Sequence, residues 1–295
     1  MSSLRHLIER GGALFHPASA TGYTLAVDVR FPTNQRIDMT ATLATGEARN
    51  LHIEITRISM GRPFAWLRLG WQDTRRNWLT SLGYGALIVA FGWTLLIFCG
   101  THPYYVAAAI SGFLLVAPVA SAGFAEMSRR YSLGQSATFD ESMDGFARNA
   151  SALFAFGVIL AACAIVWFAI SAVMLDSIFH IPAPSIEETL YRGFIDSMNR
   201  AQVQAYFTVG GILALFVFIV SVVSVPLIIA QHASAGQAMW ASLRAVFANI
   251  PAMIVWSALI LVLTVIGYAP LLLGLLFVSP ILGHATWHAY RDMVR

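Results

Sequence analysis

The sequence predicts an all-α polytopic membrane protein with six transmembrane helices, arranged as three parallel helical hairpins. The first observation behind this is composition: 58% of the 295 residues are hydrophobic, 11% are charged and the mean hydropathy is +0.68. Soluble domains carry about a quarter charged residues, so most of this chain is expected in lipid. The second and third observations are recurring asparagines and recurring proline-terminated strings, which divide the apolar segments into tandem pairs.

Six apolar stretches come close to the length of about 20 residues that crosses the hydrocarbon core of a bilayer. They lack the alternating pattern of barrel strands, so they can pair their backbone groups within lipid only as helices. The six stretches lie at about 79–100, 104–125, 151–175, 205–230, 251–268 and 270–290.

An amphipathic helix is expected before each hairpin, ending at Asn77, Asn149 or Asn249. Positions ten, six and three residues before each Asn share one helix face, because they are spaced by four and three. These positions hold Leu67, Trp71 and Thr74; Phe139, Met143 and Phe146; and Met239, Leu243 and Val246. Such helices can lie in the plane of the lipid headgroups. We interpret each Asn as a cap at the junction between helix and span; the alternative is a ring of amides around a pore mouth.

The second helix of each hairpin carries one Pro at the end of a similar string. The strings are Phe113-Leu-Leu-Val-Ala-Pro118, Ser221-Val-Val-Ser-Val-Pro226 and Leu275-Leu-Phe-Val-Ser-Pro280. A Pro inside a helix frees a carbonyl group and kinks the helix. Residues 64–130, 136–236 and 236–292 are therefore predicted to be one repeated unit, and the second unit carries an extra excursion at about 176–204.

All 18 basic residues are Arg, and the sequence contains no Lys. This excludes Schiff-base chemistry on a lysine and a phosphate-binding P-loop. The arginines are scattered along helix ends instead of forming one basic patch, so no nucleic-acid partner is expected. Most of them flank the same side of the predicted spans, and the positive-inside rule then places both termini in the cytoplasm.

Residues 1–60 differ in character from the rest, because apolar residues alternate with polar or small ones, as in residues 25–31. Alternation indicates short, half-buried strands, but a segment this short builds only a small core. We therefore expect a small β-like or disordered cytoplasmic appendage at 1–60, followed by the membrane domain at 61–295.

Several motifs carry a family resemblance, and the most specific is the C-terminal string. They are Leu282-Gly-His-Ala-Thr-Trp-His-Ala-Tyr-Arg-Asp292, Trp66-Leu-x-Leu-Gly-Trp71-x-Asp73, His102-Pro-Tyr104, Ser111-Gly-Phe-Leu-Leu-Val116 and Ser128-Arg-Arg130. With them, the stretch from about Arg57 to Arg295 resembles a family of predicted bacterial integral membrane proteins, domain of unknown function 2189. The resemblance implies a multi-pass protein of the bacterial inner membrane and no established activity. Some members of the family are labelled as cytochrome c oxidase subunits.

Four residues are predicted to form a structural polar latch. His284 and His288 lie one helical turn apart at the expected cytoplasmic end of the last span, so both imidazoles point the same way. Glu126 lies at the matching depth of the first hairpin, eight residues after its Pro. A carboxylate near the bilayer edge is costly unless it is paired, and either His288 or Arg129 is the expected partner of Glu126.

A metal or haem ligand role for His284 or His288 is the alternative to the latch. The two histidines make an incomplete zinc site, and no other cofactor is expected. Cys99 and Cys163 fall in different predicted spans, which indicates neither a disulfide framework nor a metal knuckle.

The sequence offers no catalytic motif: it lacks a nucleotide-binding glycine loop, an accessible Ser/His/Asp arrangement and the multi-histidine helices of a haem–copper oxidase core. We therefore expect no enzyme, but an inner-membrane protein that is an accessory or assembly partner of a larger membrane complex, such as a respiratory one. Its partners are then the lipid bilayer and the other subunits of that complex. The alternatives are a carrier or channel for a small or lipidic solute, and a haem- or metal-binding redox accessory.

The predicted topology can be tested with introduced cysteines. Cysteines at Ser136 and Gln237 should be shielded from an impermeant thiol reagent in intact cells, because both positions are expected in the cytoplasm. A cysteine at Ser185 should react, because it lies in the outward excursion. Strong labelling at Gln237 in sealed cells would contradict the six-span topology.

Overall fold

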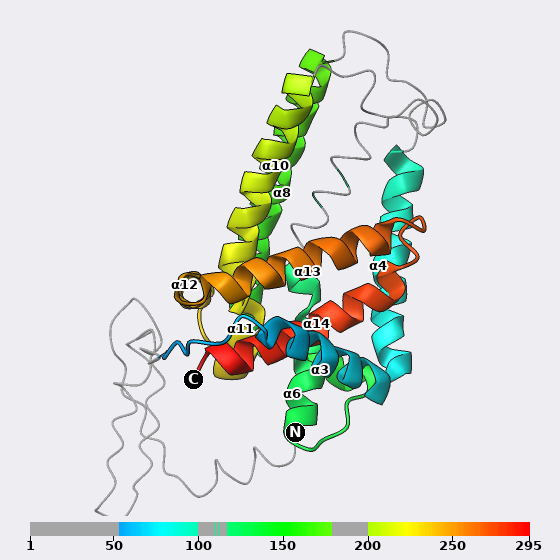
Figure 1. Ribbon diagram of the computed structural model, residues 1–295. Helices are drawn as coiled ribbons and strands as arrows, with labels where there is room; N and C mark the ends of the chain where they lie inside the picture. Colours follow the sequence, from blue (N-terminus) through cyan, green and yellow to red (C-terminus); the bar gives the residue numbers. More distant parts are fainter. Residues whose placement is uncertain (1–52, 100–108, 110–111, 113–116, 179–199) are drawn as a thin grey trace, which may run out of the picture. The chain divides into compact units, whose positions relative to one another are not determined.

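The computed structural model describes residues 53–99, 109, 112, 117–178 and 200–295 (Figure 1). Their regular structure is helical, with one isolated antiparallel bridge between Ile55 and Val294. The helices are α3 (Arg62–Arg76), α4 (Trp78–Cys99), α6 (Ala122–Ser132), α7 (Phe139–Ala147), α8 (Ala150–Ile178), α10 (Arg200–Ser221), α11 (Ser224–Gln231), α12 (Ala235–Ala248), α13 (Ile250–Tyr268) and α14 (Leu275–Met293). The appendage predicted at 1–60 lies outside the described residues, except for its last few positions.

Four segments of the described chain are long and apolar enough to cross a membrane. They are Trp78–Phe98 in α4, Ala150–Met174 in α8, Gln204–Gln231 across α10 and α11, and Ile250–Tyr268 in α13. Two of the six predicted spans are not among these four. The first half of the stretch 104–125 falls largely outside the described residues, and α14 is more polar than the four segments because its second half carries two His, one Arg and one Asp.

The short helices α3, α7 and α12 each run into a candidate span. Side-chain caps begin two of them: Thr138 accepts a hydrogen bond from the backbone of Glu141 in α7, and Ser234 does the same with Gln237 in α12. Such capping boxes satisfy N–H groups that the first turn of a helix leaves unpaired. All three helices also expose large apolar side chains, namely Phe64 and Trp71, Phe139 and Met143, and Trp240 and Phe247. This exposure suits helices that lie at a membrane interface.

The last helix, α14, packs alongside α3 and also contacts α4 and α6 (Figure 1). Its close approach to α3 requires Gly70, because a Cβ there would lie 2.4 Å from the carbonyl oxygen of Ile281 and 2.9 Å from the nitrogen of Ala285. The contact between α6 and α7 is equally close, since a Cβ at Gly145 would lie 2.5 Å from the carbonyl oxygen of Ala122. Glycine at these two positions lets neighbouring helix backbones touch.

The core lies where α6, α11 and α14 meet. The residues 122–128 of α6 and 224–229 of α11 are all buried, and α14 contributes Ala285. In the same core Trp66 of α3 and Trp256 of α13 pack edge to face, with ring centroids 5.5 Å apart. Aromatic pairs of this geometry contribute about 0.5–1.5 kcal/mol beyond the burial of their surface.

The segment before α3 closes on the end of the chain. The backbone of Glu54 exchanges hydrogen bonds of 3.1 and 3.0 Å with Arg295, and the N–H of Thr56 donates to the carbonyl oxygen of Met293 at 2.9 Å. These hydrogen bonds tie the residues before α3 to the end of α14, within the compact unit of residues 51–295.

Replacing Gly70 by Ala should destabilise the protein, because the new methyl group meets main-chain atoms of α14 that cannot move aside alone. Overpacking of this kind costs about 1–3 kcal/mol, which should appear as a lower thermal unfolding midpoint in detergent. Gly83→Ala in α4 is the matched control, since nothing lies within 4 Å of a Cβ at that position. Equal midpoints for the two variants would contradict the close α3–α14 contact.

Candidate functional site

Asn77 joins α3 to α4 and binds main-chain groups on both sides. Its side-chain oxygen accepts a hydrogen bond from the backbone N–H of Thr80 at 3.3 Å, which caps the start of α4. Its amide nitrogen donates to the carbonyl oxygen of Ala137, directly before Thr138, where α7 is capped. Asn77 therefore links the first short helix to the second.

The other two asparagines are used differently from the predicted caps. Asn149 donates its amide to the carbonyl oxygen of Ala233 at 2.9 Å, directly before the cap of α12. Asn249 makes no side-chain cap for α13. Its amide donates to the carbonyl oxygen of Thr56 at 3.1 Å, and its oxygen accepts from the N–H of Ile58 at 2.8 Å. All three amides thus bind the chain just before a short helix, and none is free to line an opening.

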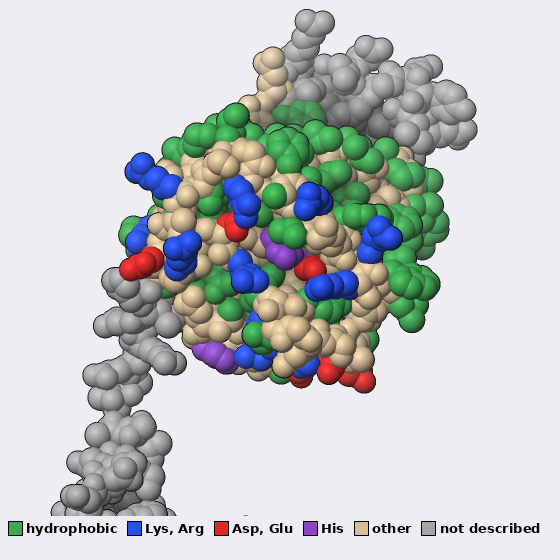
Figure 2. All heavy atoms as spheres, turned by 60° about the horizontal axis from the view of Figure 1, so that its bottom comes forward, with side chains coloured by type: hydrophobic (Ala, Val, Ile, Leu, Met, Phe, Trp, Pro, Cys, Tyr) green, Lys and Arg blue, Asp and Glu red, His purple; other side chains and the backbone are tan. Residues whose placement is uncertain are grey.

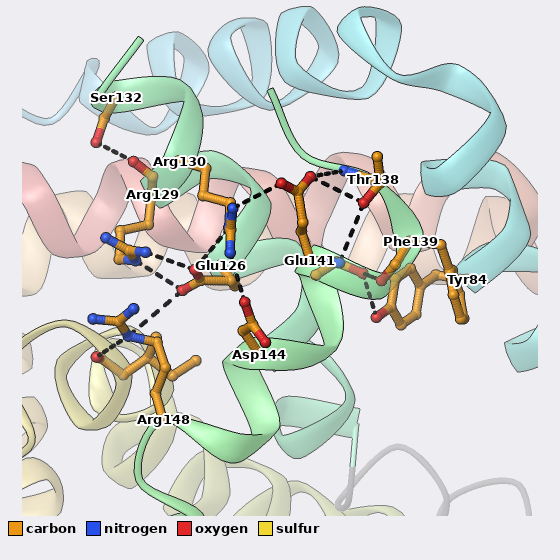
Figure 3. A network of polar contacts seen from close by, with 12 residues as sticks. Tyr84, Glu126, Arg129, Arg130, Ser132, Thr138, Phe139, Glu141, Asp144 and Arg148 are labelled. Carbon is orange, nitrogen blue, oxygen red and sulfur yellow. Dashed lines mark hydrogen bonds and ion pairs between the residues drawn. The ribbon is translucent and has the colours of Figure 1, made fainter. Parts of the chain in front are cut away.

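Glu126 of α6 is completely buried, and its carboxylate is met by arginines from two sides (Figure 3). Arg129 binds it with two parallel hydrogen bonds, Nε to Oε2 at 2.7 Å and Nη2 to Oε1 at 2.6 Å. The Nε of Arg130 lies 3.1 Å from Oε1, and the Nε of Arg148 lies 3.8 Å from Oε2. A buried carboxylate without partners would be strongly destabilising, so the arginines of this cluster offset the burial of Glu126.

The arginines of this cluster also join neighbouring helices. Arg130 reaches from α6 to two carboxylates of α7, Glu141 at 3.2 Å and Asp144 at 2.6 Å. Arg148 donates to the carbonyl oxygen of Ile229 at the end of α11. The hydrogen bonds to Glu126 raise the pKa of Arg129, which remains charged. The cluster is therefore a joint between α6, α7 and α11.

A second buried cluster, which we call the Asp73 chain, comprises Asp73, Ser128, His284, Ser81 and His288. The Ser128 hydroxyl donates to Oδ2 of Asp73 at 2.7 Å and lies 2.7 Å from Nδ1 of His284. Nε2 of His284 lies 3.2 Å from the Ser81 hydroxyl, and Nε2 of His288 lies 2.9 Å from Oδ2 of Asp73. The chain crosses α4, α14, α6 and α3 in turn, and all of its members except His288 are buried.

The hydrogen bonds of Ser128 indicate which ring nitrogen of His284 carries a proton. Ser128 has one proton and gives it to Asp73, so Nδ1 of His284 must donate to the Ser128 oxygen. Nε2 is then the acceptor for the Ser81 hydroxyl, and neutral His284 leaves every polar atom paired. Both ring nitrogens are engaged, so a metal or haem iron could bind His284 only by displacing one of these hydrogen bonds.

Asp73 is the ionised end of the chain. Burial raises the pKa of Asp73, but the hydrogen bonds from His288 and Ser128 outweigh it, so the pKa lies below its ordinary value. The Ser128 proton points at a carboxylate and not at a general base. A nucleophilic triad needs the opposite order, in which the base accepts the serine proton. The arrangement stabilises structure and does not activate Ser128.

The four residues predicted as one latch fall into two places. Glu126 and Arg129 meet, whereas His284 and His288 belong to the Asp73 chain, and within the described chain no hydrogen bond or ion pair joins Glu126 to His288. Equal distance from a proline fixes the depth of a residue along its helix. It does not fix the direction of the side chain around the helix axis.

Sequence reasoning missed Asp73, Ser128 and Ser81 as site residues. One signal could have identified Asp73, which is the acidic residue of α3 and lies four positions before Asn77. The two serines carried no signal, because a single Ser in an apolar helix is common. Among the described residues, no group of three His, Cys, Asp or Glu side chains is placed to hold a metal ion. Cys163 is a free thiol in α8.

Comparison with known proteins bears on the membrane helices. Residues 106–230 match the model of a family described as predicted integral membrane protein, DUF2189. Over these residues the resemblance found in the sequence motifs is confirmed, and the C-terminal string 282–292 lies outside the match. The matched residues include the span of α8 and all but the last residue of the span across α10 and α11. The chain is an integral membrane protein of unknown function. No curated protein and no solved structure matches it.

In this DUF2189-like chain, Glu126→Gln should lower stability, because three guanidinium groups lose their shared buried counter-charge. Removing one partner of a buried ion pair costs about 3–5 kcal/mol, measurable by thermal or denaturant unfolding in detergent. Asp144→Asn is the control: its side chain is 55% exposed, and surface pairs contribute about 0–1 kcal/mol. A Glu126→Gln midpoint as high as that of Asp144→Asn would overturn the role given to this cluster.

Asp73→Asn should change the pH dependence of stability. A carboxyl group whose folded-state pKa is lowered stabilises the folded state above its unfolded pKa of about 4, and this contribution is lost as the pH falls through the folded pKa. The difference in unfolding midpoint between wild type and Asp73→Asn should therefore be constant near neutral pH and shrink below about pH 4. Midpoints measured in detergent from pH 7 to pH 3 check this, and a difference that does not change with pH would contradict it.

Proposed function

We propose that this protein is a non-enzymatic, multi-pass protein of the bacterial inner membrane that serves as an accessory or assembly partner of a larger membrane complex, such as a respiratory one. One observation carries the proposal. The buried charged groups of the described residues, above all Glu126 and the Asp73 chain, bind other side chains, and the buried polar atoms left without a partner there are the hydroxyls of Tyr131 and Tyr268 and the indole nitrogen of Trp287. The charged groups hold helices together and leave no activated group for a substrate.

The architecture that we propose for this role is a ring of three helical hairpins with six spans. Contacts between the end of one hairpin and the start of the next support it: α6 packs on α7, α11 on α12, and α14 on α3. The asparagine amides support the same order, and Asn249 completes it by binding Thr56 before the first short helix. Small residues stand seven positions before each Asn, at Gly70, Ser142 and Ser242. They leave room for close helix contacts.

Both termini are cytoplasmic in this proposal. Arginines at the ends of the short and second helices support that orientation, because basic residues that flank spans remain on the cytoplasmic side. They include Arg75, Arg76, Arg129, Arg130 and Arg291. The exposed aromatic side chains of α3 and α12 then lie at the headgroup level of the cytoplasmic leaflet.

The outward faces of the spans provide the surface for partners. α4, α8, α10 and α13 expose large apolar side chains, among them Phe98, Phe154, Phe207 and Leu261. Such faces contact lipid or the spans of other subunits, and helices associate there by close packing. An accessory subunit needs a surface of this kind and no catalytic group.

A carrier or channel is the competing function, and the packing of the second helices disfavours it. α6, α11 and α14 contact one another through buried residues such as Ala125, Leu227 and Ala285. A solute path between the hairpins would require these three helices to separate. A redox accessory is disfavoured because both nitrogens of His284 are engaged.

Purification from native membranes tests the proposal. After mild cross-linking and solubilisation, mass spectrometry should find the same integral membrane subunits with the tagged protein in independent preparations, and the absorbance spectrum should lack a Soret band. Phe154→Ala changes an exposed side chain on the outward face of α8 and tests whether that face contacts a partner. Phe156→Ala changes a buried side chain of the same helix and is the control for effects on folding. Protein that is recovered alone, or that moves a solute across proteoliposomes, would overturn the accessory role.

A further inference from the structure

A hollow of about 580 Å³ opens on the surface between α3, α6 and α14. Asp73, Ser128 and His288 of the Asp73 chain line it, and Arg75, Arg76 and Arg291 line it as well. Figure 2 shows the corresponding face, where basic side chains surround a histidine and acidic side chains. A second hollow of about 400 Å³ adjoins it and shares Arg76 and Tyr131.

The arginines of the hollow have no counter-charge of their own. Arg75, Arg76 and Arg291 form no ion pair with another described residue, whereas Arg129 and Arg130 are paired with carboxylates. The one carboxylate that lines the hollow, Asp73, is 6% exposed, and its Oδ2 already accepts two hydrogen bonds. The hollow is lined by three guanidinium groups and by one carboxylate that already accepts hydrogen bonds. It therefore has an excess of positive charge.

Tyr131 lines both hollows and contacts one of the arginines. Its ring lies under the guanidinium of Arg76, 5.5 Å from the ring centroid, which fixes that arginine against the wall. Its hydroxyl is buried and has no hydrogen-bond partner among the described residues. Burial raises the pKa of Tyr131 to about 12, so the hydroxyl keeps its proton.

We propose that this hollow binds a phosphate group, carried either by an anionic lipid headgroup or by free phosphate. Guanidinium groups bind phosphate with two parallel hydrogen bonds, and Arg is the residue best suited to this contact. The positive-inside rule accounts for arginines near the ends of spans. It does not account for unpaired arginines from α3 and α14, far apart in the sequence, that line the same hollow.

The lipid source has a structural argument of its own. Arg76 lies two residues before Trp78, where the α4 span begins, and the side chains of Trp71 and Trp78 are exposed. Exposed tryptophans at the start of a span lie at headgroup depth. A phosphate at that depth can reach the hollow from the membrane, and a soluble phosphate can reach it from water.

The test uses the full chain purified in a non-ionic detergent. In one arm inorganic phosphate is added in increasing concentration, and sodium chloride at the same ionic strength is the control. In the other, dispersed phosphatidylglycerol is compared with phosphatidylcholine, with thermal unfolding and native mass spectrometry as readouts. Phosphate or phosphatidylglycerol should raise the unfolding midpoint. Arg76→Gln and Arg291→Gln should each weaken the apparent affinity by about tenfold, as expected for one charge-assisted contact.

Arg68→Gln is the matched control, because Arg68 is an exposed arginine of α3 that does not line the hollow. A response to phosphatidylglycerol alone identifies a headgroup, and a response to both ligands identifies the phosphate group itself. Absence of a response in both arms would overturn the proposal. The same holds if Arg68→Gln weakens binding as much as Arg291→Gln, because the effect would then be general charge attraction.

Discussion

The packing of α3 against α14 is the contact on which the rest of the described unit depends. It brings Asp73 to His288, and it places Asp292 between Arg62 and Trp66, whose side chains donate to it at 2.8 and 2.6 Å. Trp66 and Asp292 are 226 positions apart, so this contact closes almost the whole described chain. The entropic cost of closing such a long loop grows only slowly with the length of the loop. The burial of Trp66 and its neighbours offsets this cost.

Two buried carboxylates are stabilised in different ways, and each way has its own consequence. Glu126 is neutralised by arginines, so its cluster is held by charge and joins three helices firmly. Asp73 accepts hydrogen bonds from Ser128 and His288, so the Asp73 chain depends on the orientation of each proton. The first arrangement tolerates small shifts of the arginine side chains. The second holds α3, α6 and α14 in one register, because each donated proton has one acceptor within the chain.

Local contacts could be predicted from the sequence, and long-range ones could not. Arg129 lies three positions after Glu126, so helix geometry alone brings the two together. The shared direction of His284 and His288 also follows from their spacing. The partner of His288, Asp73, could not be predicted, because it lies 215 positions away and the packing of α3 on α14 had to be known first. The same holds for Asn249: its side chain resembles a cap in the sequence, yet its partners are Thr56 and Ile58.

The donors and acceptors of the two buried clusters are already paired with one another. In the Asp73 chain each proton already has an acceptor, and at Glu126 each carboxylate oxygen has a guanidinium partner. Catalysis would first have to break one of these contacts, and the buried position of the groups makes that step costly. Arginines without an ion pair to another described residue lie at the surface, among them Arg75, Arg76 and Arg291 beside His288. Positive charge without a bound partner at the surface is the chemical feature that the proposed phosphate site uses.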